Sequence, residues 1–208
     1  MLNNNQILKI YKSRKNLLDI LSSIGYEVTD YEGFNINEID AMVTNDQLDM
    51  IIENNETNQK AYIKYYSSSK QIRQGVLDDI IEDLYTIENV LEKKDVLIII
   101  TEDEPNDSIT SRLKYLFDHD GILVVIHNIN RLQYNILEHV LVPKCVILNS
   151  NQETELLSKY NIKDKKQLPE ISRFDPQALA LCMRPGNIAE FARKSATALE
   201  TNYYRVCV

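Results

Sequence analysis

The chain has 208 residues, of which 44% are hydrophobic and 26% charged, and this fits one large globular domain or two small ones. Its formal net charge of −8 argues against an autonomous nucleic-acid binder, because such proteins gain affinity when clustered Lys and Arg displace phosphate counterions. The longest apolar runs, Val96–Ile100 and Ile122–Ile126, are too short to span a bilayer, and the first residues lack a secretory pattern. We therefore expect a soluble protein of a reducing compartment, with no membrane partner.

The cysteines give little sign of a metal site. Cys145, Cys182 and Cys207 are odd in number, widely spaced and without a C-x-x-C pair. Cys145 with His139 and His127 could form a zinc site, but the closely spaced ligand pairs of such sites are missing. We expect three buried thiols that behave as small apolar residues, and neither a metal nor a cofactor.

The first expected element is an amphipathic helix over residues 6–25. Apolar residues recur there at intervals of three and four, and Gly25 is typical of the position that ends a helix. Three lysines fall mostly on other faces of this helix: Lys9, Lys12 and Lys15. Such a cluster can meet a phosphate backbone, although it is more often a solvated helix face.

The first part of the chain, residues 1–135, predicts an α/β domain. A polar stretch, Asp30–Gln47, is a short helix or a loop. The expected elements that follow are strands Leu48–Glu53 and Ala61–Tyr66 as a hairpin, a helix over residues 70–92 with an N-cap among Ser67, Ser68 and Ser69, strand Asp95–Thr101, a helix over Ser108–Asp118 and strand Ile122–Ile126. The uniformly apolar strands are typical of strands covered on both faces, and the alternation with helices indicates parallel pairing.

The pattern changes after His139, and residues 136–208 predict a smaller α+β domain. Its expected elements are a short strand Val146–Leu148, a helix to Tyr160 opened by a capping box at Ser150–Glu153, an irregular segment Gln167–Pro169, a helix Gln177–Met183 capped by Asp175, a turn Arg184–Gly186, and a hairpin of Asn187–Arg193 and Tyr203–Val208.

Five blocks in this second domain follow one family pattern in the same order. They are His139–Cys145 (HVLVPKC), Gln167–Ile171 (QLPEI) with Asp175-Pro176, Arg184–Gly186 (RPG), Arg193–Ala198 (RKSATA) and Tyr204-Arg205. Together they resemble the assembly domain of subunit five of eukaryotic RNA polymerases, a family whose archaeal members lack the N-terminal jaw domain. More loosely, the helix before Gly25-Tyr26 and the run Asn128–Glu138 resemble that eukaryotic jaw domain. The chain therefore looks like a eukaryotic-type, two-domain member.

The chain departs from the family pattern at several positions. Cys145 stands in place of a second His, Leu179-Ala180 in place of Arg-Tyr, and Cys182 in place of the following Gly. Ala196 and Leu199 replace the Glu and Gly of the S-E-T-A-G segment. With a composition rich in Asn, Ile and Lys, which suggests an A+T-rich genome, these departures favour a member carried by a large DNA virus.

The resemblance implies a non-catalytic subunit of DNA-directed RNA polymerase that assembles on the largest subunit and places its jaw domain, a nuclease-like fold, near downstream duplex DNA. The polymerase active site would lie on other subunits, so no residue here would be catalytic. The candidate partner-binding residues are His139, Gln167, Pro169, Asp175, Arg193, Ser195, Tyr204 and Arg205. Arg193 and Arg205 either bind a partner or form internal hydrogen bonds. We expect the protein in the virion or a cytoplasmic virus factory if it is viral, and in the nucleus if cellular.

Two rival functions come from other classes. Metal-dependent nucleases carry D-x(n)-[DE]-x-K on a hairpin, and Asp49 and Lys64 stand at plausible positions, but Tyr62 replaces the second carboxylate. The sheet is therefore expected to carry at most a degenerate nuclease site. The other rival is a free-standing protein-binding adaptor, against which the only argument is the multi-block match.

Overall fold

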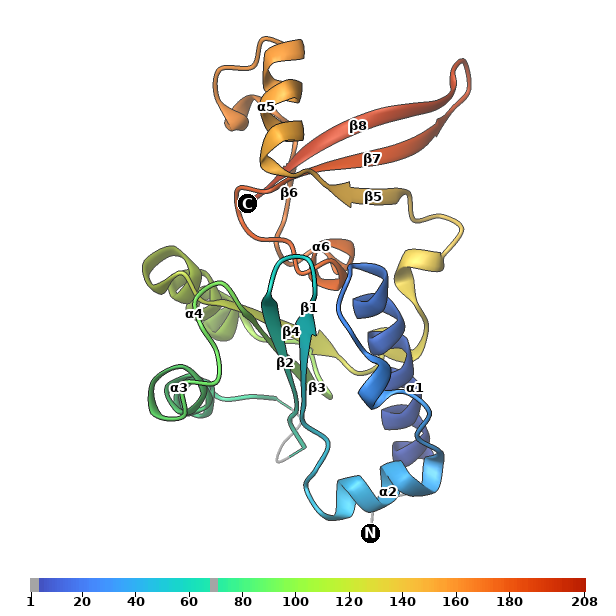
Figure 1. Ribbon diagram of the computed structural model, residues 1–208, viewed down its shortest axis with the longest axis vertical. Coiled ribbons are helices and arrows are strands. Elements are labelled where there is room, and N and C mark those ends of the chain that lie inside the picture. Colours follow the sequence, from blue (N-terminus) through green and yellow to red (C-terminus); the bar gives the residue numbers. More distant parts are fainter. Residues whose placement is uncertain (1–3, 68–70) are drawn as a thin grey trace. The chain divides into compact units, whose positions relative to one another are not determined.

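The computed structural model describes residues 4–67 and 71–208 (Figure 1). The chain divides into two compact units, Met1–Asn135 and Ile136–Val208, and each is built around its own four-stranded sheet. Each unit combines a sheet with helices, which confirms the expected mixed α/β architecture in two parts. In the part of the chain that is described, no helix is both long enough and apolar enough to cross a membrane.

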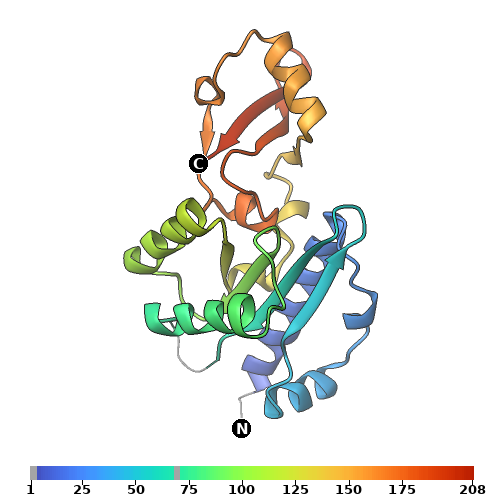
Figure 2. The same cartoon turned by 60° about the vertical axis from the view of Figure 1, so that its left-hand side comes forward.

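The sheet of the first unit has the strand order β1-β2-β3-β4. Its strands are β1 Met50–Asn54, β2 Gln59–Tyr65, β3 Val96–Thr101 and β4 Leu123–Asn128. β1 and β2 form an antiparallel hairpin, whereas β2, β3 and β4 are parallel, as the alternation of strands and helices predicts. Every residue of β3 is buried, because α3 and α4 lie on one side of the sheet and α1 on the other (Figures 1 and 2).

The helices of the first unit follow the expected order. They are α1 Asn4–Ser23, α2 Ile36–Thr44, α3 Gln74–Glu82 and α4 Asp107–Tyr115. α1 ends at Ser23, and Gly25, the residue predicted to end it, has a φ of 95°. The Tyr26 amide donates to the Leu21 carbonyl at 3.1 Å in a Schellman motif. The polar stretch contains α2, which begins with a capping box of Asn35 and Glu38.

The helix expected over residues 70–92 is shorter than predicted. α3 begins at Gln74, and its N-cap is Arg73, whose side chain makes no capping bond. Of the expected serine caps, Ser68 and Ser69 lie outside the described residues. After Glu82 the chain forms one π-helical turn, Asp83–Ile87, which rotates the apolar register, so that Ile87 is 65% exposed. The spacing of apolar residues therefore overestimated the helix at both ends.

The second unit has a sheet of order β5-β7-β8-β6. Its elements are β5 Lys144–Ile147, α5 Ser150–Lys159, β6 Glu170–Ile171, α6 Pro176–Ala180, β7 Ile188–Ser195 and β8 Leu199–Cys207. β7 and β8 form a long antiparallel hairpin in which Phe191 pairs with Tyr203. The expected terminal hairpin is therefore confirmed, and it extends further toward its tip than the sequence predicts.

Several element boundaries of the second unit differ from the expectation. The capping box lies one residue earlier, because Asn149 has the extended backbone of an N-cap and bonds with Gln152, so Ser150 is already helical. Strand β6, which the sequence did not predict, follows the irregular segment and pairs in parallel with the end of β8. α6 ends at Ala180, three residues before the predicted end at Met183. β5 begins at Lys144, two residues before the predicted strand.

Candidate functional site

The position of a nuclease site is occupied by a closed hydrogen-bond network. The carboxylate of Asp49 accepts from the Tyr62 hydroxyl at 3.1 Å and from the Lys64 ammonium at 2.9 Å, and the amide of Tyr65 approaches it at 3.4 Å. Burial and the neighbouring Asp49 charge raise the pKa of Tyr62 far above its usual value, so the phenol stays neutral. Asp49 is thus bound to groups of its own sheet, and the second carboxylate that a catalytic metal ion requires is replaced by a neutral phenol.

Potential metal ligands do not gather elsewhere in the described residues either. No group of three or more His, Cys, Asp or Glu side chains among them is arranged to hold a metal ion. Cys145 lies half-buried in β5, where burial raises the pKa of its thiol to about 12. That thiol is therefore protonated at neutral pH and is a poor metal ligand.

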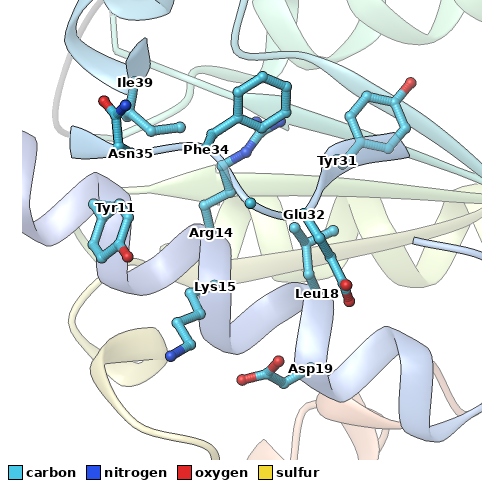
Figure 3. Close-up of a pocket in the computed structure, with 11 residues that line it drawn as sticks. Tyr11, Arg14, Lys15, Leu18, Asp19, Tyr31, Glu32, Phe34, Asn35 and Ile39 are labelled. Carbon is cyan, nitrogen blue, oxygen red and sulfur yellow. The ribbon is translucent and has the colours of Figure 1, made fainter. Parts of the chain in front are cut away.

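The candidate DNA-proximal lysines lie on the exposed surface of α1. Lys9, Lys12 and Lys15 are all solvent-exposed. The Lys9 ammonium donates to the Asn130 side chain at 3.1 Å, which holds α1 against the turn after β4. Lys15 lies at the rim of a hollow between α1 and residues 31–39, with a volume of about 440 Å³ (Figure 3). Acidic side chains outnumber basic ones in the first unit, so α1 is a basic strip on an acidic domain.

Arg14, inside the lysine cluster, has a structural role that sequence reasoning missed. It is only 4% exposed, donates to the Leu48 carbonyl at 3.1 Å, and lies over the rings of Phe34 and Tyr31 (Figure 3). Desolvation by burial lowers its pKa. Arg14 therefore joins α1 to the loop that leads into α2, and it is not available to a phosphate backbone.

Three of the candidate partner-binding residues serve the second unit internally. The Asp175 carboxylate caps α6 by accepting from the Gln177 amide at 2.9 Å, as predicted for this residue. The Gln167 side chain accepts from the Lys163 amide at 3.1 Å, and the Pro169 carbonyl accepts from the Val206 amide at 2.9 Å. These contacts shape the loop beside β8.

His139 and Tyr204 lie in different surroundings. The exposed His139 accepts at Nδ1 from the Leu141 amide at 3.2 Å, in a turn that leaves Val140 and Leu141 89% and 84% exposed. Tyr204 instead packs against a small core, and its ring centroid lies 6.0 Å from that of Tyr160. The core residues are Leu148, Leu156 and Ile188. Tyr204 thus contributes to folding, whereas the turn at His139 exposes apolar side chains.

Arg193 and Arg205 lie on the same face of the hairpin, and both contact one aromatic ring. The guanidinium carbon of Arg193 lies 4.5 Å from the centroid of the Tyr203 ring, and that of Arg205 lies 5.4 Å from it. Arg205 also lies 5.9 Å from the centroid of Phe191. Sequence reasoning missed Tyr203, although alternation along β8 places residues 203 and 205 on one face.

The hairpin tip contains an unusual backbone conformation. The Ser195 hydroxyl accepts from the amides of Thr197 and Ala198 at 3.4 and 3.3 Å, which organises the turn. Leu199 follows with a φ of 57°, a left-handed value that glycine adopts without steric cost. Cys182, after α6, has a φ of 49° and occupies the position of a Schellman motif where glycine is usual. Both residues stand where the family pattern has glycine.

Comparison with known proteins finds relatives of the second unit. Residues 134–207 match the family model "RNA polymerase Rpb5, C-terminal domain". DNA-directed RNA polymerase subunit Rpo5 of Thermococcus kodakarensis is 46% identical over 76 residues, which cover 36% of this chain and 92% of that relative. The chain belongs to the RNA polymerase subunit 5 family.

Another similar protein spans both units. The DNA-directed RNA polymerases I, II, and III subunit rpabc1 of Dictyostelium discoideum is 28% identical over 209 residues, covering 98% of each chain. The Rpo5 of Pyrococcus abyssi, by contrast, is 47% identical over 76 residues, or 36% of this chain. The first unit is thus shared with a eukaryotic member of the subunit 5 family.

Proposed function

We propose that this protein is a non-catalytic subunit of a multisubunit DNA-directed RNA polymerase. The observation that carries the proposal is membership of the subunit 5 family, based on the second unit and its relatives. Proteins of this name are polymerase components in archaea and eukaryotes, and the same assembly with other polymerase subunits follows for this chain. The polymerase active site lies on other subunits, and no residue of this chain takes part in the chemistry.

The two units have different roles in this proposal. The second unit docks onto the largest subunit through the β7–β8 hairpin and the loop around Gln167–Asp175. The hydrogen bonds of Gln167, Pro169 and Asp175 within the second unit support docking through this loop. They fix the shape of the loop beside β8, so the loop and the hairpin can present one preformed surface. Arg193, Ser195 and Arg205 contact the partner, and the exposed turn at His139 adds apolar area.

The first unit acts as a jaw near downstream duplex DNA. Its acidic character leaves α1 as the surface best suited to phosphates, with Lys9, Lys12 and Lys15 exposed on it. Contacts of this kind position a duplex without reading its bases. They are too few to hold DNA without the rest of the complex, since affinity grows with the number of neutralised phosphates.

The two rival functions have less support. The sheet suits a nuclease-like fold whose site is degenerate, because Asp49 is bound to Tyr62 and Lys64 and lacks a second carboxylate. A nuclease would cleave DNA with magnesium or manganese and lose that activity in Asp49→Ala; we expect no cleavage by either protein. A free-standing adaptor is disfavoured by the family relationship.

Co-purification tests the proposal. The full chain, tagged and produced in its own host system, should be isolated together with the two largest polymerase subunits at a fixed ratio. Isolation of the chain with unrelated proteins and without those subunits would reject a polymerase role. The protein would be located where its polymerase is: the virion or a virus factory for a viral owner, the nucleus for a eukaryotic cell. The relatives named above are archaeal and eukaryotic, and they give no preference to a viral owner.

A further inference from the structure

The arginine face of the β7–β8 hairpin carries two cations whose donors are unused. Neither Arg193 nor Arg205 forms a hydrogen bond or an ion pair within the described residues, and each lies close to an aromatic ring. The Nε of Arg205 is shielded from solvent and has no hydrogen-bond partner. Each guanidinium has five N–H donors, so about ten donors are concentrated around one tyrosine. The terminal N–H groups of both guanidiniums also lack an acceptor among the described residues, and a partner that supplies one gains charge-assisted hydrogen bonds.

Strand alternation places the carboxylates of the hairpin on the opposite face. Residues paired across antiparallel strands point to the same side, so Arg205 with Ala189 and Tyr203 with Phe191 share one face. Glu200 pairs with Lys194, and Glu190 bonds to Asn202, on the other face. The arginine face therefore has positive charge that no neighbour on the hairpin neutralises.

The geometry of this face is fixed before any partner binds. The guanidinium carbons of Arg193 and Arg205 lie 4.5 and 5.4 Å from the centroid of the Tyr203 ring, and contact with this ring restricts the long arginine side chains. A planar guanidinium that is already stacked loses less conformational entropy when it binds a carboxylate with two parallel hydrogen bonds. Tyr203 is thus a positioning residue for both arginines.

We propose that the arginine face, Arg193–Tyr203–Arg205, binds two carboxylates on an acidic segment of the polymerase subunit onto which the second unit docks. This inference rests on the proposed function, and it specifies the chemistry of the partner. A protein carboxylate suits the site better than a nucleic-acid phosphate. Under the proposed function the second unit docks on another protein, and an Asp or Glu carboxylate can accept two parallel hydrogen bonds from a planar guanidinium.

Competition for assembly tests the role of the three residues. Two differently tagged full-length copies, one unaltered and one variant, are produced together, and their ratio is measured in the purified polymerase. We expect Arg193→Glu with Arg205→Glu to lower incorporation at least about tenfold, as is usual for a buried charge pair that is broken. Tyr203→Phe should behave like the unaltered chain and Tyr203→Ala should be several-fold weaker. Lys194→Glu, on the opposite face, is the matched control and should be incorporated normally.

Cross-linking identifies what lies opposite the arginines. The Arg193→Lys variant introduces an amine that a water-soluble carbodiimide joins directly to a carboxylate in contact with it. We expect mass spectrometry to find this amine linked to Asp or Glu of another polymerase subunit. Thermal unfolding of each free variant shows whether the second unit is still folded, so a loss of incorporation by a folded variant supports the inference.

The outcomes separate this inference from the proposed function. Equal incorporation of the double glutamate variant and the unaltered chain would overturn the inference alone. Incorporation that depends on nucleic acid, and is lost after nuclease treatment, would also overturn it by assigning the face to phosphates. If the unaltered chain does not enter a polymerase at all, the proposed function fails and the inference fails with it.

Discussion

Replacing Leu199 with glycine should stabilise the hairpin of the second unit. Leu199 is 88% exposed and has a φ of 57°, so its side chain gains little from burial while its backbone is in a left-handed conformation. That conformation costs an L-residue about 1–2 kcal/mol more than glycine. The greater freedom of glycine in the unfolded chain offsets about 0.5–1 kcal/mol of this gain. The expected net stabilisation of Leu199→Gly is about 0.5–1 kcal/mol.

Two measurements on the full chain can detect this change. The melting temperature of the second unit should rise by roughly 2–8 °C, given the usual relation for a unit of this size. Native-state hydrogen exchange at the tip amides, around Lys194 and Glu200, should slow, because strain at the tip acts first on local opening. Ala196→Gly is the matched control: Ala196 has no left-handed φ, so glycine there should destabilise by about 0.5–1 kcal/mol. If both variants destabilise the hairpin equally, the strain argument is wrong.

Three further predictions concern other parts of the chain. Cys182→Gly should stabilise α6 by about 1 kcal/mol in denaturant unfolding, because glycine fits the left-handed position after the helix; a clear loss of stability would mean that the burial of the thiol outweighs the strain. Burial lowers the pKa of His127 from 6.5 to about 4, so the unfolded chain binds more protons between these values. The stability of the first unit should therefore be fully present above pH 6.5 and fall by about 3 kcal/mol as the pH drops toward 4, and the His127→Leu variant should lack this component; an unchanged pH profile in that variant would contradict the assignment. Lys12→Glu should leave incorporation into the polymerase unchanged in the competition assay, since α1 belongs to the jaw; a loss as large as that of the double glutamate variant would refute the division of roles.

The parallel core of the first unit was predictable because its strands have a strong physical signature. The runs around Ile98 and Val125 are uniformly apolar, and such short runs are typical of strands covered on both faces. The end of α1 was equally clear, because Gly25 adopts a φ that other residues avoid. Buried strands and glycine helix ends can thus be predicted from the sequence, because few other local structures suit those residues.

The exact start of α5 and the end of α3 could not be predicted, because the sequence is compatible with more than one boundary. The capping box could begin at Asn149 or Ser150, since both can cap, and the structure has Asn149 as the N-cap. The π-helical turn after α3 changes the register of Leu84 and Ile87 without any local marker. Cys182 and Leu199 differ from these cases, because both replace glycines of the family pattern and their left-handed backbones could have been predicted from that replacement.

The grouping of the candidate site residues could not be predicted from the sequence. Arg193 and Arg205 were expected to bind a partner or to bond internally, and their stacking on Tyr203 joins them into one face. Tyr204, in the same motif, points to the core instead. Alternation along β8 predicts that residues 203 and 205 share a face. That Arg193 lies on the same face follows only from the pairing register of β7 and β8, which is a tertiary property.

The most direct test of the account is affinity purification of the tagged full-length chain from its native transcription system. The account predicts that the chain is recovered with the two largest polymerase subunits at a constant ratio, and that the folded Arg193→Glu, Arg205→Glu variant is not. Recovery of the chain without those subunits would contradict its assignment as a polymerase subunit.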